Sequence, residues 1–137
     1  MEFLKTKFKN AFLINFSSYT DDRGSFFRFY CENEFKKNNL SIKWVQMNHS
    51  INKKKGTLRG MHFQVEPYSE IKLVRCIKGS VFDVIVDLRK DSDTYLQWQA
   101  FELSPENNNA ILIPKGFAHG FQTLEKNSEL IYLHSEY

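Results

Sequence analysis

The stretch Thr57-Leu58-Arg59-Gly60-Met61-His62-Phe63-Gln64 places a guanidinium, a glycine, an imidazole and a carboxamide within six residues of a strand-like run. A strand that serves only to pack against a core has no need for Arg, His and Gln around a glycine. Other polar side chains lie far away in sequence, and a β fold could gather them around this run: Arg23, Lys72, Asp83, His119 and Tyr132. We therefore interpret residues 57–64 as an active-site strand.

The length and composition indicate a single folded domain. At 137 residues the chain can bury a core of its own. It contains 13 Phe and 6 Tyr, and 26% of its residues are charged, which disfavours disorder. The net charge is only +3, and we interpret Lys53-Lys54-Lys55 as a solvated loop. We expect one domain over residues 1–137 and no nucleic-acid partner, because no RNA-binding signature or basic helix is present.

Neither the cysteines nor the N-terminal segment suggests another class of protein. Cys31 and Cys76 are far apart and form no C-x-x-C motif, so no redox or zinc motif is indicated. Residues 1–16 include lysines but lack the apolar core of a signal peptide. No run approaches the roughly 18 apolar residues of a membrane span. We expect a cytoplasmic protein without a membrane partner.

Short apolar runs separated by turns predict an all-β sandwich or barrel. We expect residues 72–77 and 81–88 to form a hairpin across Lys78-Gly79-Ser80. Residues 17–24 are predicted to be a turn-rich loop and residues 32–38 the one short helix. The other predicted strands are residues 11–16, 25–30, 44–50, 97–103, 110–113, 118–123 and 129–133.

The central strand poses a geometric problem. Strict alternation puts His62 and Gln64 on one face and Arg59 on the other. Arg59 and His62 can face one cleft only if the strand is irregular between them. Gly60 is where a bulge would be tolerated, so we predict one there.

The run Pro114-Lys115-Gly116-Phe117-Ala118-His119 resembles the second motif of the cupin superfamily. Its turn leads into a strand that presents His119 and Phe121 on one side. Metal-binding cupins carry His-x-His and a downstream Glu in the partner motif, whereas this chain has His62-Phe63-Gln64. A carboxamide is a poor ligand for a divalent transition metal. We expect no metal and no cofactor, with a site completed by Glu70 as the alternative.

The polar set suits proton transfer beside a carbonyl group. A neutral imidazole is a suitable base near neutral pH, and a lysine ammonium can stabilise an enolate oxygen. A tyrosine can deliver a proton, and arginines can hold a diphosphate. Taken singly, Lys72 and Tyr132 would be ordinary strand residues, a lone histidine would be structural, and Asp83 would be an ion-pair partner. Their joint occurrence favours a catalytic role over these structural ones.

Six segments of the chain match the pattern of a known family. They are, in order, DDRG (21–24), QMNHS (46–50), LRGMHFQ (58–64), KLV (72–74), DVIVDLR (83–89) and IPKGFAHGF (113–121). With these segments the chain, from about Asp21 to Tyr137, resembles the dTDP-4-dehydrorhamnose 3,5-epimerase family. Tyr132 falls where that family has a tyrosine. The resemblance implies a cupin-type jelly roll, usually a homodimer, that binds a nucleoside-diphosphate 4-keto-6-deoxysugar without metal or cofactor.

The resemblance also implies roles by position. His62 would remove protons alpha to the ketone, Lys72 would stabilise the enolate oxygen, and Tyr132 would reprotonate from the opposite face. Arginines and His119 would line the phosphate and sugar site, while Phe26 and two amides would contact the nucleotide, Phe26 in the site of a partner subunit. The predicted substrate-binding set is Arg23, Phe26, Gln46, Asn48, Arg59, Asp83, His119 and Phe121.

Two departures from the family pattern bear on these roles. Family members usually continue past Tyr137, and that tail supplies an aspartate that orients the catalytic histidine. We therefore expect His62 to lack a partner, to use Asp83, or to work in a shortened variant. Arg28 stands where many dTDP-sugar enzymes have a glutamate, and Glu70 replaces a usual glutamine. Both changes predict an altered preference for the nucleotide base.

The favoured interpretation is a metal-independent epimerase that inverts C3, C5 or both next to a C4 ketone. One alternative is a ketoisomerase that moves the carbonyl between C4 and C3 through the same enediol chemistry. The other is a non-catalytic, sugar-nucleotide-binding cupin.

Overall fold

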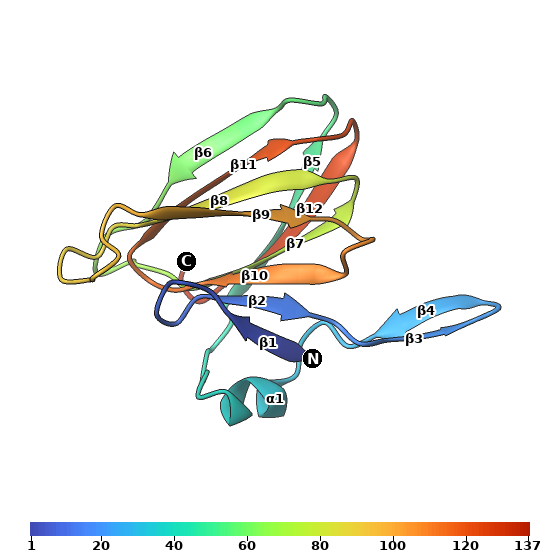
Figure 1. Cartoon of the computed structure of the whole chain (residues 1–137), viewed down its shortest axis with the longest axis horizontal. Coiled ribbons are helices and arrows are strands. Elements are labelled where there is room, and N and C mark those ends of the chain that lie inside the picture. The colour runs from blue at the N-terminus through green and yellow to red at the C-terminus, as the bar shows by residue number, and fades with distance from the viewer.

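A computed structural model describes all residues from Met1 to Tyr137 and contains twelve strands and one helix (Figure 1). One sheet comprises β1 (Glu2–Lys5), β2 (Phe12–Asn15), β10 (Asn109–Ile113), β7 (Lys72–Lys78), β12 (Ser128–His134) and β5 (Gln46–Asn52), in that order. The other comprises β6 (Leu58–His62), β11 (Phe117–Thr123), β8 (Val81–Asp87) and β9 (Trp98–Leu103). All pairings are antiparallel. The predicted all-β sandwich is confirmed.

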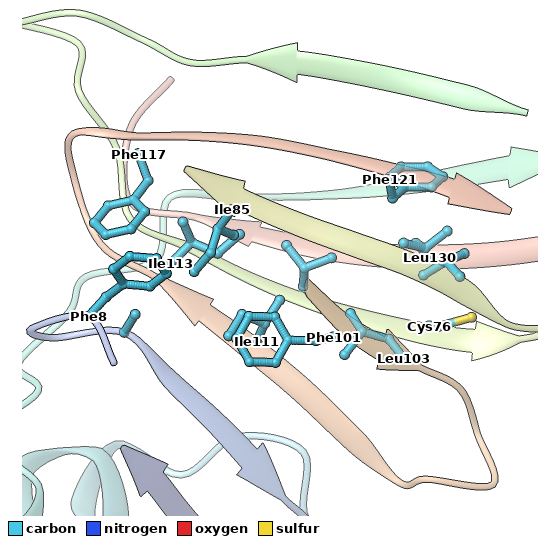
Figure 2. Close-up of a cluster of buried hydrophobic side chains, with 13 residues drawn as sticks. Phe8, Cys76, Ile85, Phe101, Leu103, Ile111, Ile113, Phe117, Phe121 and Leu130 are labelled. Carbon is cyan, nitrogen blue, oxygen red and sulfur yellow. The ribbon is translucent and has the colours of Figure 1, made fainter. Parts of the chain in front are cut away.

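The main core lies between the two sheets (Figure 2). Val74 and Cys76 of β7 meet Val81 and Ile85 of β8 there, within a cluster of 13 buried residues. Burying a Val, Leu, Ile or Phe side chain contributes roughly 1.5–3 kcal/mol. A second cluster covers the outer face of the six-stranded sheet, where Leu73 packs with residues around the helix. Strand β7 is therefore buried on both faces.

Strands β7 and β8 do not pair with each other, so the predicted hairpin is wrong. β7 pairs with β10 and β12, whereas β8 pairs with β9 and β11. The turn Lys78-Gly79-Ser80 carries the chain from one sheet to the other. Each strand has an apolar face, and these faces meet across the core rather than lying side by side.

Residues 17–24 are not the predicted loop. Instead β3 (Ser18–Asp21) and β4 (Gly24–Phe27) form a hairpin that pairs with no other strand. It projects away from the two sheets (Figure 1). Tyr19 and Phe26 on this hairpin are 79% and 73% exposed.

The predicted helix is confirmed as α1 (Glu32–Lys37). Acidic residues in its first turn and lysines in its last turn complement the helix dipole. Phe35 is its buried residue and joins the second cluster. This short helix falls far below the length and hydropathy needed to span a membrane, and the structure has no other.

Candidate active site

Strand β6 bulges at Gly60, as the sequence predicted. His62 pairs with His119 and Arg59 pairs with Phe121, so β6 advances three residues while β11 advances two. Gly60 has a φ of +97°, and a Cβ there would lie 2.6 Å from the His119 carbonyl oxygen. The extra residue allows Arg59 and His62 to act on the same cleft, because strict alternation would send them to opposite faces.

His119 and Asp83 form a buried pair between the sheets. His119 Nε2 donates to Asp83 Oδ2 at 2.7 Å, and the side chains are 1% and 0% exposed. Burial raises the pKa of Asp83, against the opposing effect of His119. Nδ1 of His119 is buried and has no partner within the chain. The other oxygen of Asp83, Oδ1, is buried without a partner, and no hydrogen bond joins this carboxylate to His62, so the expectation that Asp83 could orient His62 is wrong.

His62 and Tyr132 come from opposite sheets, and each ring lies near that of His119. The ring centroids of His62 and His119 are 5.9 Å apart, and those of His119 and Tyr132 are 6.4 Å apart. Burial, then the charges of Lys72 and His119, hold the pKa of His62 below 6.5. Burial, with a smaller contribution from Asp83, raises the pKa of Tyr132 well above 10.0. At neutral pH the site therefore offers a neutral imidazole and a protonated phenol.

Lys72 lies in a buried network of charged and polar groups. Its Nζ is 2.9 Å from Glu70 Oε1, and His134 Nδ1 is 2.6 Å from Glu70 Oε2. Burial acts to raise the pKa of Glu70, but the hydrogen bonds from His134 and Lys72 outweigh it, so this pKa is lowered. No group of three His, Cys, Asp or Glu side chains is placed to hold a metal ion. Glu70, the alternative metal ligand, has both oxygens engaged by cationic or N–H donors.

Sequence reasoning missed His134. It lies two residues after Tyr132 on β12, and side chains two apart in a strand share a face. That spacing was the signal that could have identified it.

The predicted nucleotide contacts Gln46 and Asn48 lie on β5, beside this network. Asn48 pairs in register with Tyr132, and Gln46 with His134. Asn48 Nδ2 is 3.2 Å from His134 Nε2. Gln46 Nε2 donates to the backbone carbonyl of Glu136 at 2.7 Å. Arg59 belongs to the same region, because its Nε donates to Asn52 Oδ1 of β5 at 2.7 Å.

Three predicted site residues do not reach this cleft within one chain. Phe121 is 2% exposed and packs in the main core (Figure 2), so we no longer assign it a ligand contact. Arg23 and Phe26 lie on the projecting hairpin, where Arg23 is ion-paired with Asp21 at 2.6 Å. Arg28 is ion-paired with Glu34 of the helix at 3.3 Å.

The fold is a cupin-type jelly roll, and it gathers ionisable side chains of both sheets around His119. The model of the dTDP-4-dehydrorhamnose 3,5-epimerase family matches residues 5–137. The chain belongs to this family.

Individual relatives agree with this assignment. The dTDP-4-dehydrorhamnose 3,5-epimerase of Methanothermobacter thermautotrophicus is 48% identical over 122 residues, which are 89% of this chain and 65% of that protein. That of Shigella flexneri is 41% identical over 96% of this chain and 73% of its own. The chain thus spans about two thirds to three quarters of the length of these relatives.

Solved structures show the same fold. The dTDP-4-dehydrorhamnose 3,5-epimerase of Bacillus anthracis, with TDP and PPi bound, has a TM-score of 0.97 and 40% identity, over 99% of this chain and 78% of that one. The dTDP-6-deoxy-D-glucose-3,5-epimerase of Legionella pneumophila, in complex with dTDP-4-keto-L-rhamnose, has a TM-score of 0.93 and 36% identity, over 99% and 72%.

Proposed function

We propose that this protein is an epimerase that inverts C3, C5 or both of a nucleoside-diphosphate 4-keto-6-deoxysugar, without a metal. The relatives described above are epimerases by name, which favours epimerisation over the ketoisomerase alternative. Their names and bound ligands also make the dTDP-linked sugar the first substrate to test.

The observation that carries the proposal is the position of His62 and Tyr132 on opposite sheets, each with its ring near that of His119. Epimerisation removes a proton from one face of a carbon and returns one to the other face. A single side chain rarely reaches both faces, whereas two groups from separate sheets can. The lowered pKa of His62 suits a base, and the raised pKa of Tyr132 suits a proton donor.

The remaining steps follow from the charges around these two groups. Removal of the proton next to the C4 ketone places negative charge on the carbonyl oxygen, and the Lys72 ammonium is the group we assign to stabilise it. Tyr132 then protonates the enolate carbon from the other side. The Arg59 guanidinium, with amides of β5, supplies donors for the diphosphate and the base.

We further propose that the protein acts as a homodimer in which the β3–β4 hairpin completes the partner's site. An isolated two-stranded hairpin is marginally stable in water, and this one exposes Tyr19 and Phe26. The hairpin projects away from its own sheets (Figure 1), which supports a role for its residues Arg23 and Phe26 in the site of another subunit. Mixing inactive Arg23→Ala subunits with inactive His62→Asn subunits should then restore part of the activity. Mixtures that stay inactive would contradict the shared site.

The activity is tested by offering the protein several nucleoside-diphosphate 4-keto-6-deoxysugars in D2O and following the products by NMR. Epimerisation gives deuterium at C3 or C5 with inverted configuration. A product with a C3 ketone would identify a ketoisomerase, and binding without exchange would identify a non-catalytic protein. Competition among dTDP, GDP, UDP and CDP tests the base. The prediction that Arg28 disfavours thymidine fails if dTDP is preferred and Arg28→Ala loses that preference.

A further inference from the structure

A connected row of four side chains runs from β5 across β12 to the start of β7: Asn48, His134, Glu70 and Lys72. We propose that Glu70, supported by His134, is a positioning residue that aims the Lys72 ammonium at the carbonyl oxygen of the substrate. This inference rests on the proposed function, because it assumes that Lys72 stabilises the enolate oxygen of the substrate.

The strand pairing accounts for the row. His134 of β12 lies opposite Lys72 of β7 in the register, and Gln46 of β5 lies opposite His134 on its other side. Tyr132, two residues before His134, packs against the core between the sheets, so His134 also faces inward. Glu70 precedes β7 by two residues and reaches both partners. The network is thus built from three segments that meet only in the folded chain.

The side-chain amide of Asn48 allows the hydrogen-bond donors and acceptors of this row of four side chains to be assigned. Asn48 Nδ2 can only donate, so His134 Nε2, at 3.2 Å, is its acceptor. The neutral ring then carries its proton on Nδ1 and donates it to Glu70 Oε2 at 2.6 Å. Lys72 Nζ donates to the other oxygen, Oε1, at 2.9 Å. Each carboxylate oxygen therefore has its own donor, and the Glu70 carboxylate is held from both sides.

This arrangement keeps the Lys72 ammonium charged and fixed in position, as an oxyanion-stabilising group must be. The side chains of Lys72 and Glu70 are only 8% and 5% exposed, and a buried ammonium stays charged only beside an opposite charge. A free lysine side chain would also lose about 2 kcal/mol of rotamer entropy on ordering. Glu70 engages one of the three ammonium donors, so two remain for substrate. The lysine is charged and fixed before the enolate forms.

Glu70 also acts on the proposed base. The charged or titratable groups that influence His62 are Lys72, His119 and His134, which lower its pKa, and Glu70, which raises it. A neutral side chain at position 70 would therefore lower the pKa of His62 further. That shift would report the loss of the carboxylate charge near His62.

The chain offers a matched control on its surface. Glu129 also joins a lysine and a histidine, with Lys78 Nζ at 3.1 Å and His49 Nε2 at 3.0 Å. Lys78 and His49 are exposed, and the pair lies outside the cleft. Glu129→Gln thus removes the same kind of pairing without touching the proposed machinery.

The test compares Glu70→Gln, Lys72→Met, the double variant and Glu129→Gln in the D2O exchange assay. A displaced catalytic group can cost on the order of 100-fold, so Glu70→Gln should lower kcat by roughly 10- to 100-fold with little change in KM. In the Lys72→Met background the same substitution should cost nothing more. The acid limb of the pH profile of Glu70→Gln should move to lower pH, while Glu129→Gln behaves as the wild type.

Two kinetic results would overturn the proposal: wild-type kcat in Glu70→Gln, or an equal loss from Glu70→Gln with and without Lys72. A measurement without substrate separates it from the proposed function. NMR titration of the His62 ring in Glu70→Gln should give a lower pKa than in the wild type, and an unchanged value would also overturn the proposal. Absence of exchange in the wild type would instead contradict the proposed function, and the titration would still decide the placement of Glu70.

Discussion

His119 holds Asp83 in a buried hydrogen bond of 2.7 Å, while the exposed ring of His62 lies 5.9 Å from the ring of His119. The aspartate thus supports the buried histidine rather than the exposed one. The two histidines therefore differ in environment: His62 is accessible to a ligand, whereas His119 is fixed in the interior.

This difference predicts different effects for changes at the two positions. His62→Asn should lower deuterium exchange by roughly 100- to 10,000-fold, since it removes the proposed base. It should barely change the free energy of unfolding, because the side chain is exposed. Asp83→Asn should cost about 3–5 kcal/mol, as breaking a buried pair leaves its partner uncompensated. Exchange assays and denaturant unfolding measure both, and full exchange in His62→Asn would refute the assignment of the base.

The pH profile should reflect the environment of His62. The base must be neutral, so activity is lost as the pH falls through the pKa of His62. Partial desolvation and the charges of Lys72 and His119 hold that pKa below 6.5 although the residue is exposed, so the acid limb of kcat/KM should lie below pH 6.5. Lys72→Met removes a nearby positive charge and should move the limb upward. A wild-type limb above pH 6.5 would show that another group is titrating.

Gly60→Ala should disturb both stability and activity. The residue has a φ of +97°, and a Cβ would meet the backbone at the His119 carbonyl oxygen and at Gly120 Cα, 2.6 and 2.8 Å away. Strain of this kind costs about 1–3 kcal/mol, and relief of the clash would displace His62. Gly56→Ala is the control, because its φ of +79° is also positive but a Cβ there meets nothing within 4 Å. Equal deuterium-exchange rates in the two variants would contradict the inference that the bulge positions His62.

The sequence predicted strands better than it predicted sheets. Alternation located β7 and β8, but it does not say whether two apolar faces lie side by side or opposite each other, and here they are opposite. The β3–β4 hairpin escaped detection for another reason. Every residue of β3 is exposed, so no buried face imposes an apolar period on its sequence.

The site was predictable where one residue carried the signal. Gly60 marked the bulge because Arg59 and His62 could not otherwise face one cleft. The partners of buried charges were not predictable, since Asp83 and His119, or Glu70 and His134, are joined only by strand order across the sheets. Burial was equally invisible, so Phe121, His119 and Asp83 were predicted to contact substrate although they are only 2%, 1% and 0% exposed.

Asp87 should contribute stability that depends on pH. Burial acts to raise its pKa, but hydrogen bonds from Arg89, Thr94 and Ser92 outweigh it and hold the pKa far below 3.8. Its contribution is therefore present above the unfolded-state pKa and is lost as the pH falls toward the folded-state value. Asp87→Asn should cost about 3–5 kcal/mol at neutral pH, with the difference from the wild type shrinking below about pH 4. The exposed Asp91→Asn is the control, and a constant difference across that range would contradict the prediction.

The last prediction concerns the division of labour between His62 and Tyr132. Tyr132→Phe leaves the proposed base and Lys72 in place, so the enolate should still form. With no phenol on the far side, His62 can return the exchanged proton only to the original face. Deuterium should then enter C3 or C5 with the starting configuration retained, whereas the wild type inverts it.

The raised pKa of Tyr132 makes this test specific, because the hydroxyl stays protonated throughout the accessible pH range. Loss of the hydroxyl should cost about 1 kcal/mol of stability, too little to explain a change in stereochemistry. Tyr30→Phe, which removes a hydroxyl from the second hydrophobic cluster, should exchange and invert as the wild type does. If Tyr132→Phe inverts its substrate at the wild-type rate, Tyr132 is not the acid, and the donor must be sought among the other side chains of β5 and β12.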